Sequence, residues 1–409
     1  MPAPLLRSPN LTLPTPPPAR PVRVAFVIDN LGRAGTESQL LALIRGLDRT
    51  RVTPSLVLLD GSAAESRALE PESCSVLRLG VRKLASPAAV RAAARLVRAW
   101  RADRPDVVQA YFLDSAYLAA PAARAAGVLR VVRVRNNLGY WLTRKHRVLG
   151  RLISPLVDVT LTNSEQGRSA LAGRVAVIEN GVDLDRYADF PPPFAGPAVR
   201  VGCVANLRPV KNVAGLLRAA RVVCDRHPTV TFAVAGDGPD RPALEGLRAE
   251  LGLQDRFTFH GSVADVPAFL RTVDVAVLPS DSEGMSNALL EYLAAGRAVV
   301  ATDVGANAEL TGPAGGIIVP AGDVTALAGG ICGFITDPDA ARRMAAAGRE
   351  RVAARFGRAV LCRRFEAFYT ELARNPGWLT PNYGDHEHPV VTYLRCTAGN
   401  ANHSANDHT

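Results

Sequence analysis

The chain reads Val22-Arg-Val-Ala-Phe-Val-Ile28, then Asp29-Asn-Leu-Gly-Arg-Ala-Gly-Thr36, and then a segment at 37–47. The first run is apolar and of strand length, the second is a polar loop with two glycines, and the third has apolar residues at helical spacing. A buried strand that leads through a glycine loop into a helix is typical of the start of a doubly wound α/β domain.

The same alternation of strands and helices continues beyond this opening. It runs as far as Glu179-Asn-Gly-Val-Asp183, and Phe190-Pro-Pro-Pro-Phe194 is a stiff linker by composition. The alternation restarts with a strand at 199–204 and a helix at 213–227, and it reaches a strand at 298–302. This pattern predicts an α/β protein whose parallel sheets carry helices on both faces.

Length and composition divide the chain into two folded domains between flexible ends. At 409 residues the chain is too long for one ordinary core and fits two domains. We therefore expect a flexible proline-rich tail at 1–20, a Rossmann-like domain at 21–187, a second at 188–354, a helix at 355–374 and a disordered tail at 375–409.

The charge of the chain suggests an anionic partner without identifying it. Lysine and arginine number 48 against 38 acidic residues, which gives a formal charge of +10. Such an excess suits nucleic acid, an acidic membrane surface or a phosphorylated ligand. The sequence has no basic run interleaved with aromatic residues as in a single-strand groove and no zinc-finger pattern, so we do not expect a nucleic-acid partner.

The sequence also indicates a compartment. The six cysteines are scattered and form no CxxC pair, which is typical of reduced thiols rather than of a zinc site or a disulfide scaffold. The first 20 residues have no apolar core of the signal-peptide type, and the chain has no run of about 20 apolar residues. We therefore expect a cytoplasmic protein whose only membrane contact is peripheral.

The most informative stretch for function is Pro279-Ser-Asp-Ser-Glu283-Gly-Met-Ser-Asn287-Ala-Leu-Leu-Glu291. It follows an apolar strand, and Ser286 or Asn287 is placed to cap the helix that comes next. The N-terminus of a helix offers N–H groups that suit a phosphate, while Glu283 and Glu291 can accept hydrogen bonds from hydroxyl groups of one ligand. The alternative is an ordinary capped helix with one solvated glutamate.

Other segments place cations or glycines at predicted strand ends. Leu207-Arg208-Pro-Val-Lys211-Asn212 has two cations that can meet an anionic ligand, the arginine bidentately and the lysine as a point charge; the alternative is a solvated loop. Ala235-Gly-Asp-Gly-Pro239 permits a tight turn that a ligand can approach. Gly32-Arg-Ala-Gly35-Thr36 lacks GxGxxG spacing, which disfavours a nicotinamide cofactor.

In combination and in this order, these segments resemble the GT-B-fold retaining glycosyltransferases of family 4 over residues 22–374, with Glu283 and Glu291 as the E-x7-E pattern. The resemblance implies two Rossmann-like domains that face each other across a cleft, the first for the acceptor and the second for the donor nucleotide. It implies that the helix at 355–374 crosses back to the first domain. It also implies retaining transfer of a sugar from a nucleotide-diphosphate sugar to a hydroxyl of a carbohydrate or lipid-linked acceptor, in polysaccharide or glycolipid assembly.

The resemblance assigns roles position by position. Arg208, Lys211 and Glu283 are the catalytic set, in which the two cations bind the donor diphosphate and the glutamate holds the donor sugar. Glu291 is assigned to the ribose hydroxyls. The other donor-binding positions that the resemblance implies are Gly35, Thr36, Gly236, His260, Gly261, Val263, Gly284, Met285, Ser286 and Asn287.

The acceptor side shows one departure from the family. Members often carry a histidine in the segment that here reads Val107-Val-Gln109-Ala-Tyr111, and the resemblance implies that such a histidine contacts the donor sugar near the reacting carbon. Gln109 or Tyr111 can supply a hydrogen bond in its place. The acceptor-side residues implied are Gln109, Tyr111, Arg135 and Asn136, and Asn137-Leu-Gly-Tyr-Trp141 resembles the acceptor-side loop of many members.

Three further expectations concern metal, membrane and alternative functions. No DxD-type metal clamp follows a strand, so we expect no metal and no cofactor besides the nucleotide sugar as co-substrate.

Basic residues interleaved with apolar ones between 130 and 151 suggest an anionic membrane surface or a lipid-phosphate acceptor; the alternative is an ordinary basic surface helix. A nucleotide-sugar epimerase of the same fold and a non-catalytic sugar-nucleotide-binding protein remain open as alternatives.

Overall fold

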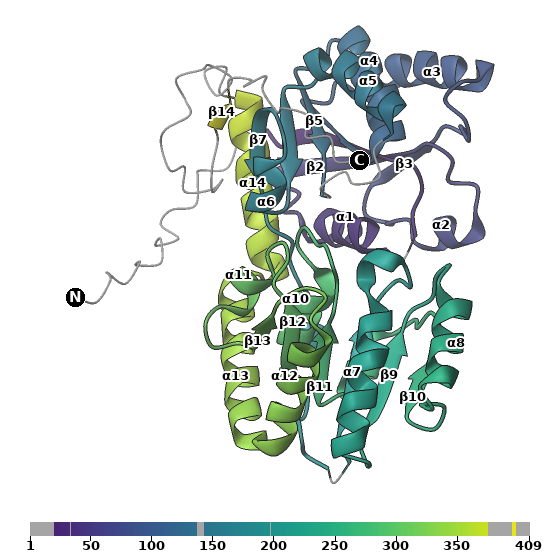
Figure 1. Ribbon diagram of the computed structural model, residues 1–409. Coiled ribbons are helices and arrows are strands. Elements are labelled where there is room, and N and C mark those ends of the chain that lie inside the picture. Colours follow the sequence, from purple (N-terminus) through teal and green to yellow (C-terminus); the bar gives the residue numbers. More distant parts are fainter. Residues whose placement is uncertain (1–19, 33, 137–142, 197, 375–394, 398–409) are drawn as a thin grey trace. The chain divides into compact units, whose positions relative to one another are not determined.

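The computed structural model describes residues 20–32, 34–136, 143–196, 198–374 and 395–397, which belong to two compact units (Figure 1). Unit 1 contains the described residues up to Ile178 and those from Cys362 onward. Unit 2 contains Glu179–Leu361. Each unit has its own sheet with its own helices.

Unit 1 is built on an eight-stranded sheet in the order β14-β7-β6-β5-β4-β1-β2-β3. Its strands are β1 (Val22–Ile28), β2 (Val52–Leu58), β3 (Ser75–Arg78), β4 (Val107–Tyr111), β5 (Arg130–Val134), β6 (Val159–Thr162), β7 (Gly173–Val177) and β14 (Arg395–Thr397). The first seven pair in parallel, and Phe26 of β1 lies opposite both Leu56 and Gln109. The winding direction reverses between β1 and β4, which is where such sheets bind ligands at their carboxyl ends.

Helices cover both faces of this sheet: α1 (Gly35–Gly46), α2 (Ala64–Ala68), α3 (Pro87–Asp103), α4 (Leu113–Ala126), α5 (Arg144–Ile153), α6 (Glu165–Ser169) and α14 (Arg358–Arg374). On the face of α3 and α4, Trp100 packs with Val27 and Val108 of the sheet. On the other face, Tyr369 of α14 meets Phe26 edge-on with 6.1 Å between the ring centroids. Aliphatic strands that are buried on both sides explain the continuous apolar runs of the sequence.

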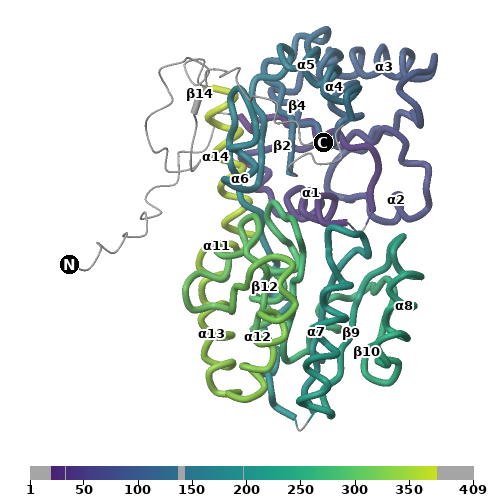
Figure 2. Tube along the Cα trace, viewed as in Figure 1, coloured from purple at the N-terminus to yellow at the C-terminus, as the bar shows by residue number. Residues whose placement is uncertain are grey.

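Unit 2 repeats this plan with a six-stranded parallel sheet in the order β10-β9-β8-β11-β12-β13. Figure 2 labels its β9, β10 and β12 together with helices of the same unit. Its strands are β8 (Arg200–Val204), β9 (Thr231–Ala235), β10 (Phe257–Phe259), β11 (Val275–Leu278), β12 (Ala298–Thr302) and β13 (Ile317–Val319). Its helices are α7 (Val213–Arg226), α8 (Arg241–Glu250), α9 (Val266–Arg271), α10 (Asn287–Ala294), α11 (Asn307–Thr311), α12 (Val324–Thr336) and α13 (Pro338–Arg355).

The core of unit 2 lies on both faces of its sheet. Val234 packs with Leu216 of α7 and Ile331 of α12 on one face, and Ala276 packs with Leu289 of α10 on the other. The sheet order again reverses, this time between β8 and β11. Two doubly wound units confirm the predicted pair of Rossmann-like α/β domains.

The segment at 179–187 belongs to unit 2, whereas the sequence analysis grouped it with the first domain. Asn180 N donates to Met285 Sδ at 3.1 Å, and Arg358 Nη1 lies 2.8 Å from Asp183 Oδ2. These partners are far away along the chain, so no local pattern indicates them.

The helix predicted at 355–374 is α14, and it crosses to unit 1 as expected. Its first turn belongs to unit 2 and the rest of it to unit 1. Tyr369 Oη donates to Gln109 Oε1 at 3.0 Å, and Asp48 N donates to Glu366 Oε1 at 2.8 Å. The C-terminal helix is therefore part of the packing of unit 1.

Strand β14 corrects the expectation that the segment after residue 374 is disordered throughout. Arg395–Thr397 pair antiparallel with β7, and Cys396 lies opposite Arg174. So short an edge strand takes its order from the neighbour it pairs with, which is why its own composition did not indicate it.

Membrane, thiol and metal features can be stated for the described residues. No helix among them combines the length and apolar character that a bilayer crossing needs. Cys203, Cys224 and Cys332 are buried free thiols, Cys74 is a half-buried one, and Cys362 is buried. Within the same residues, no three His, Cys, Asp or Glu side chains are grouped so that they could share a metal ion.

Candidate functional site

Three loops meet at the carboxyl ends of the central strands of unit 2. Strand β8 lies between β9 and β11, so the loops after these strands emerge side by side. Backbone hydrogen bonds join them: Leu207 N donates to Asp237 O at 3.0 Å, and Asp281 N donates to Val210 O at 2.9 Å. The three segments of the second half that the sequence analysis singled out therefore form one structural site.

The centre of this site is an ion pair between Lys211 and Glu283. Lys211 Nζ lies 2.6 Å from Glu283 Oε1, and Ser280 Oγ donates to the same oxygen at 2.7 Å. Ser280 is fully buried, and its carbonyl accepts a hydrogen bond from Thr302 Oγ1 at 2.6 Å. The Glu283 side chain is 9% exposed and that of Lys211 26% exposed, so the carboxylate is held in place while part of the lysine side chain reaches solvent.

Arg208 precedes Lys211 on the same 3-10 turn, Pro209–Lys211. Lys211 N donates to Arg208 O at 2.9 Å, which fixes the two backbones relative to each other. The Arg208 side chain is exposed and forms no ion pair with the described residues. The structure thus brings the Lys211 side chain to Glu283, and it joins Arg208 to the site through the backbone.

Asn212, to which the sequence analysis gave no role, links this turn to the next loop. Its φ of 46° is left-handed, its Oδ1 accepts from Gly215 N at 2.9 Å, and its Nδ2 donates to Asp281 Oδ1 at 2.8 Å. Asparagine tolerates this conformation and caps helices well, so its place before an apolar helical run was an available signal. Ser280 had no such signal, because its acceptor is brought to it by the loop.

Gly236 and Gly261 have backbone roles in this site. Gly236 N donates to Gly261 O at 2.8 Å, and the two residues have φ of 139° and 68°. A Cβ at Gly236 would overlap the carbonyl oxygen of Ala205, and one at Gly238 would overlap that of Leu207. Glycine at these positions lets the loops after β8, β9 and β10 touch.

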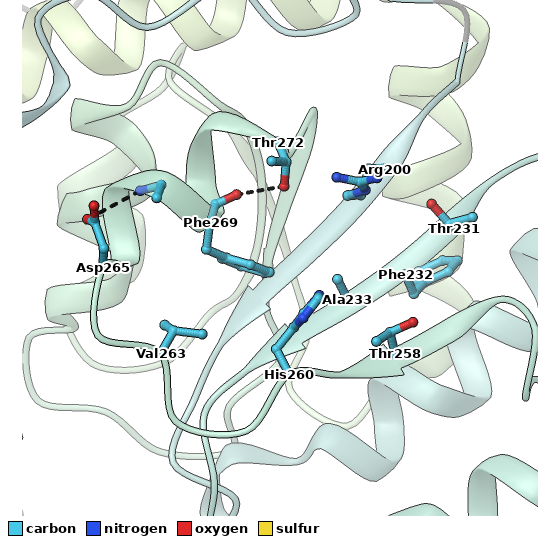
Figure 3. Close-up of a pocket in the computed structure, with 11 residues that line it drawn as sticks. Arg200, Thr231, Phe232, Ala233, Thr258, His260, Val263, Asp265, Phe269 and Thr272 are labelled. Carbon is cyan, nitrogen blue, oxygen red and sulfur yellow. Dashed lines mark hydrogen bonds between the residues drawn. The ribbon is translucent and has the colours of Figure 1, made fainter.

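His260 and Val263 line a pocket of about 490 Å³ between strands β8–β10 and helix α9 (Figure 3). The His260 ring meets Phe269 edge-on with 5.8 Å between the ring centroids. Lys211 and Glu283 do not line this pocket. These two donor-binding candidates therefore lie beside a hollow along the sheet face, which is a separate feature from the ion pair.

Helix α10 begins directly after the Glu283 loop. Ser286 caps it, because its Oγ accepts from Leu289 N at 3.3 Å, whereas Asn287 is the first helical residue. The first N–H groups of this helix therefore lie close to Glu283 in sequence, at the positive end of the helix dipole.

The same loop is clamped by two other segments of unit 2. Asn180 donates from Nδ2 to Asn287 Oδ1 at 2.8 Å and from N to Met285 Sδ at 3.1 Å. Ala306 N donates to Gly284 O at 2.9 Å. Met285 is buried, so its side chain serves the packing of the loop, and only its backbone and those of its neighbours are left for a ligand.

Glu291 lies on the second turn of α10 and is half-buried. Burial raises the pKa of its carboxyl from the ordinary 4.5 to about 7, and the charge of Arg186 opposes this shift only in part. Near neutral pH the group is therefore present in both protonation states.

In unit 1, Gly35 and Thr36 form the first turn of α1. The preceding residue, Ala34, supplies no side-chain cap, and Gly35 is exposed. Uncapped N–H groups at a helix N-terminus suit an anion, which agrees with the role that the resemblance implies. The next residue, Glu37, is buried, and burial raises the pKa of its carboxyl.

Gln109 and Tyr111 are buried in unit 1 instead of being open to a ligand. Gln109 is fully buried; its Nε2 donates to Tyr111 Oη at 2.8 Å, and its Oε1 accepts from Tyr369 Oη at 3.0 Å. Burial raises the pKa of the Tyr111 hydroxyl. The acceptor-side role expected for these two side chains does not agree with this arrangement, because β4 directs them into the packing beneath α14.

Arg135 and Asn136 follow β5 at its carboxyl end and are half-buried. Arg135 N donates to Leu161 O at 2.8 Å, which continues the pairing with β6. Arg133 is one of the basic residues between 130 and 151 that suggest an anionic surface, yet it is buried on β5. The segment Asn137-Leu-Gly-Tyr-Trp141 lies outside the described residues.

Both halves of the chain match families of known proteins. Residues 33–186 match the model described as Glycosyltransferase Family 4, and residues 198–337 match the one described as Glycosyl transferases group 1. A 2-deoxystreptamine glucosyltransferase of Streptomyces kanamyceticus is 28% identical over 366 residues, which is 80% of this chain and 92% of that protein. A GDP-mannose-dependent alpha-(1-6)-phosphatidylinositol monomannoside mannosyltransferase of Mycobacterium tuberculosis is 31% identical over 279 residues, 61% of this chain and 72% of that protein.

Solved structures share the fold. Anabaena HepE in complex with UDP and glucose superimposes with a TM-score of 0.74 at 21% identity, over 85% of this chain and 99% of that one. The lipopolysaccharide outer core galactosyltransferase WaaB, in its apo form, has a TM-score of 0.67 at 16% identity, over 86% of this chain and 100% of that one.

Two doubly wound units are the GT-B fold that these solved structures share, and the family matches make the chain a glycosyltransferase of this class. The chain belongs to the family of glycosyl transferases group 1, with a family 4 N-terminal half, and its activity is the transfer of a sugar. The predicted family, fold and enzyme class are thereby confirmed.

Proposed function

We propose that this enzyme is a retaining, metal-independent glycosyltransferase that moves a sugar from a nucleotide-diphosphate donor to a hydroxyl of a carbohydrate or lipid-linked acceptor, in polysaccharide or glycolipid assembly. The observation that carries the proposal is the Lys211 ammonium, held 2.6 Å from Glu283 where three strand-end loops meet, with Arg208 exposed on the same turn. The names of the mannosyltransferase and of the UDP-bound structure support a nucleotide sugar as donor.

The donor diphosphate would lie against these cations. When the bond between the sugar carbon and the β-phosphate oxygen breaks, negative charge grows on the phosphate. A fixed ammonium, a guanidinium and the N–H groups of the α10 N-terminus stabilise that charge without having to reorganise. Glu291 would accept hydrogen bonds from the ribose hydroxyls. Lys211 and Ser280 both bond to Oε1 of Glu283, so its other oxygen would accept a hydrogen bond from a hydroxyl of the donor sugar.

Retention on one face of the sugar agrees with the bonding of Glu283. An ion pair and a hydrogen bond hold its Oε1, which makes the carboxylate a weak nucleophile for a double displacement. The acceptor oxygen would instead bond to the sugar carbon on the face that the phosphate leaves, and the departing phosphate would take the acceptor proton. Proton NMR of the first product settles this: an anomeric configuration opposite to that of the donor contradicts retention.

Metal independence is supported by the two cations, which occupy the role that a divalent ion has in metal-dependent transferases. Turnover is expected to be unchanged in EDTA. Activity that EDTA abolishes and Mg²⁺ restores would overturn this part of the proposal.

The decisive test of the function is a thermal-shift panel of UDP, GDP and their sugars, followed by turnover assays with the donor that binds. A donor at 100 times its Kd is expected to add about 2.7 kcal/mol of stability. Donor hydrolysis or transfer supports the proposal. Interconversion of the donor sugar without an acceptor indicates an epimerase, and binding without any turnover indicates a non-catalytic protein.

An anionic membrane surface is proposed as a peripheral partner of unit 1, at the cytoplasmic side. Helix α5 exposes Val148 and Leu152, which are 49% and 68% exposed, one turn apart on the same helix. The exposed cations of α5 are Arg144, Lys145, Arg147 and Arg151. Sedimentation with vesicles of phosphatidylglycerol is expected to exceed that with phosphatidylcholine, and equal sedimentation with both removes the electrostatic contact.

A further inference from the structure

Arg133 lies in β5 and Arg135 directly after it, in positions where the strand pattern calls for apolar residues. Side chains alternate along a strand, so Val131, Arg133 and Arg135 share one face. Val131 belongs to the core beneath α4, and Arg133, the next residue on that face, is only 8% exposed. Arg133 is thus a cation inserted at the end of an aliphatic core.

The partners of Arg133 do not balance its charge. Its Nη2 donates to Thr160 Oγ1 at 3.1 Å, and its Nε is buried without a hydrogen-bond partner among the described residues. The groups that face it are the Arg135 guanidinium and the hydroxyl of Tyr117, which itself donates to the His146 carbonyl at 3.2 Å. No carboxylate of the described residues pairs with Arg133 or Arg135.

Arg297 in unit 2 shows how this protein binds a buried guanidinium for structural purposes. It is 2% exposed and donates to the carbonyl oxygens of Ala295 at 2.9 Å and Val273 at 2.8 Å, and also to that of Pro191. Three carbonyl acceptors surround Arg297, against a single hydroxyl for Arg133. The difference marks Arg133 as a cation whose acceptors do not come from the described residues.

Burial and mutual repulsion act in the same direction on this pair. Burial and, to a smaller extent, the charge of Arg135 together lower the pKa of Arg133 to about 10; burial also lowers the pKa of Arg135. A buried cation without an anion lowers the free energy of unfolding, and packing does not compensate for this loss. An anion between the two guanidiniums would remove this cost and satisfy the unpartnered donors.

We propose that Arg133 and Arg135 bind a phosphate group of the acceptor. The inference rests on the proposed function and on the acceptor role that the family resemblance implies for the first domain. A phosphate offers several oxygens to two forked guanidiniums, and it can come from a soluble phosphorylated sugar or from a lipid headgroup. The packing of Tyr117 against the carbonyl of His146 places this pair beside α5, the helix proposed to meet the membrane.

The test uses full-length protein and inorganic phosphate at constant ionic strength. All variants carry Arg208→Ala and Lys211→Ala, which remove the two cations expected to hold the donor diphosphate, so that phosphate does not report on those cations. Tm is expected to rise with phosphate and to saturate. With Arg133→Gln or Arg135→Gln, the phosphate concentration at half-saturation is expected to rise about tenfold or more, because a hydrogen bond to a charged group is lost.

The matched control is Arg98→Gln on α3, an exposed arginine with no partner among the described residues, which is expected to respond to phosphate as the parent does. Without phosphate, Arg133→Gln is expected to keep or raise Tm, because an unbalanced buried charge has gone. An Arg133→Gln variant that has a lower Tm without phosphate and yet binds phosphate like the parent would overturn the proposal. Arg133 would then have a structural role only. A parent without any saturable response overturns it as well.

Two further measurements complete the test. The first distinguishes a soluble phosphate from a lipid phosphate, and the second distinguishes failure of the anion site from failure of the proposed function. Glycerol 1-phosphate that competes with inorganic phosphate points to a soluble acceptor, and phosphatidylglycerol vesicles that compete where phosphatidylcholine vesicles do not point to a lipid. If no nucleotide sugar binds to protein with Lys211 intact while phosphate still binds through Arg133, the proposed transfer fails and the anion site stands. The reverse result removes the anion site alone.

Discussion

At the scale of single residues, the site depends on a charge that is held in place before any ligand arrives. Lys211 is fixed by Glu283, and Glu283 is fixed in turn by the buried Ser280, whose carbonyl accepts from Thr302. In the proposed reaction, such a chain of contacts would remove the cost of orienting the ammonium, which is what makes fixed charges effective in catalysis. Replacing one link is therefore expected to affect turnover more than the loss of the ion pair alone.

Lys211→Ala is expected to lower kcat/KM by about 100- to 1000-fold, by analogy with the loss of one donor to a developing oxyanion. The measurement is a nucleotide-release assay with the donor that the thermal-shift panel identifies. Lys83→Ala, which removes an exposed lysine of unit 1, is the matched control and is expected to act like the parent. A Lys211→Ala enzyme within threefold of the parent contradicts the role assigned to this ammonium.

Glu291→Gln is expected to change the pH dependence of stability. The pKa of Glu291 is 4.5 when unperturbed and about 7 in the fold, so between these values the folded protein binds more protons than the unfolded chain. The free energy of unfolding therefore falls as pH rises from about 4.5 to 7. Above pH 7 the protein bears the full destabilisation by the charged carboxylate. At pH 8 the glutamine variant is expected to be more stable by on the order of 1–3 kcal/mol, and at pH 5 by much less.

Chemical denaturation of both proteins at pH 5 and pH 8, without nucleotide, measures this difference. The same advantage at both pH values would show that the carboxyl does not titrate in this range. Nucleotide affinity gives a second reading: hydroxyls that donate to Glu291 favour its charged form, so the parent should bind more weakly at pH 6 than at pH 8.

At the scale of elements, the site is a set of loops that can approach one another only because particular residues lack a side chain. The strands end in register, and Gly236 then turns with a φ of 139° against the carbonyl of Ala205. Gly305 plays the same part beneath the Glu283 loop, where a Cβ would overlap the carbonyl oxygens of Glu283 and Gly284. These glycines allow the loops of the candidate site to approach one another.

Gly236→Ala is expected to destabilise unit 2 by several kcal/mol, because the new Cβ overlaps backbone and the φ is unfavourable for alanine. Calorimetry or urea denaturation measures the loss. Gly246→Ala in the middle of α8 is the matched control: nothing lies within 4 Å of its Cβ, so it should gain about 0.5–1 kcal/mol. Equal effects of the two substitutions would contradict this account.

At the scale of the whole molecule, the end of the chain completes the unit with which the chain began. Tyr369 of α14 bonds to Gln109 of β4, 260 residues earlier, and packs edge-on against Phe26 of β1. Gln109 is thereby satisfied at both ends of its amide, which explains how a polar residue sits fully buried in a central strand.

Tyr369→Phe is expected to cost about 1–3 kcal/mol, because it leaves the buried Gln109 Oε1 without its donor. Urea denaturation, followed by a probe of unit 1, measures the loss. A triple variant that also carries Gln109→Leu and Tyr111→Phe should recover part of it, since all three polar partners are then gone. A triple variant that is no better than the sum of the single ones would show that the hydroxyl contributes through something other than this bond.

Local sequence determined the elements, the two-domain plan and the family of this protein. The spacing of apolar residues and the glycines at strand ends can be recognised within a few residues. They predict helices and strands because these elements form between residues that are close along the chain. The positions of Lys211, Glu283 and Glu291 after buried strands or on the following helix were equally local features, so their grouping at one edge of a parallel sheet could be predicted.

Only the tertiary structure decided which polar side chains are available to a ligand. The sequence predicts Gln109 as a site residue, but its side chain is bonded to Tyr369 inside unit 1. It predicts Arg133 as part of a basic surface, but Arg133 is a buried cation without an anion among the described residues. The pKa of Glu291 is likewise set by what packs around it. Burial and hydrogen-bond partners come from segments far apart in the chain, and no local period encodes them.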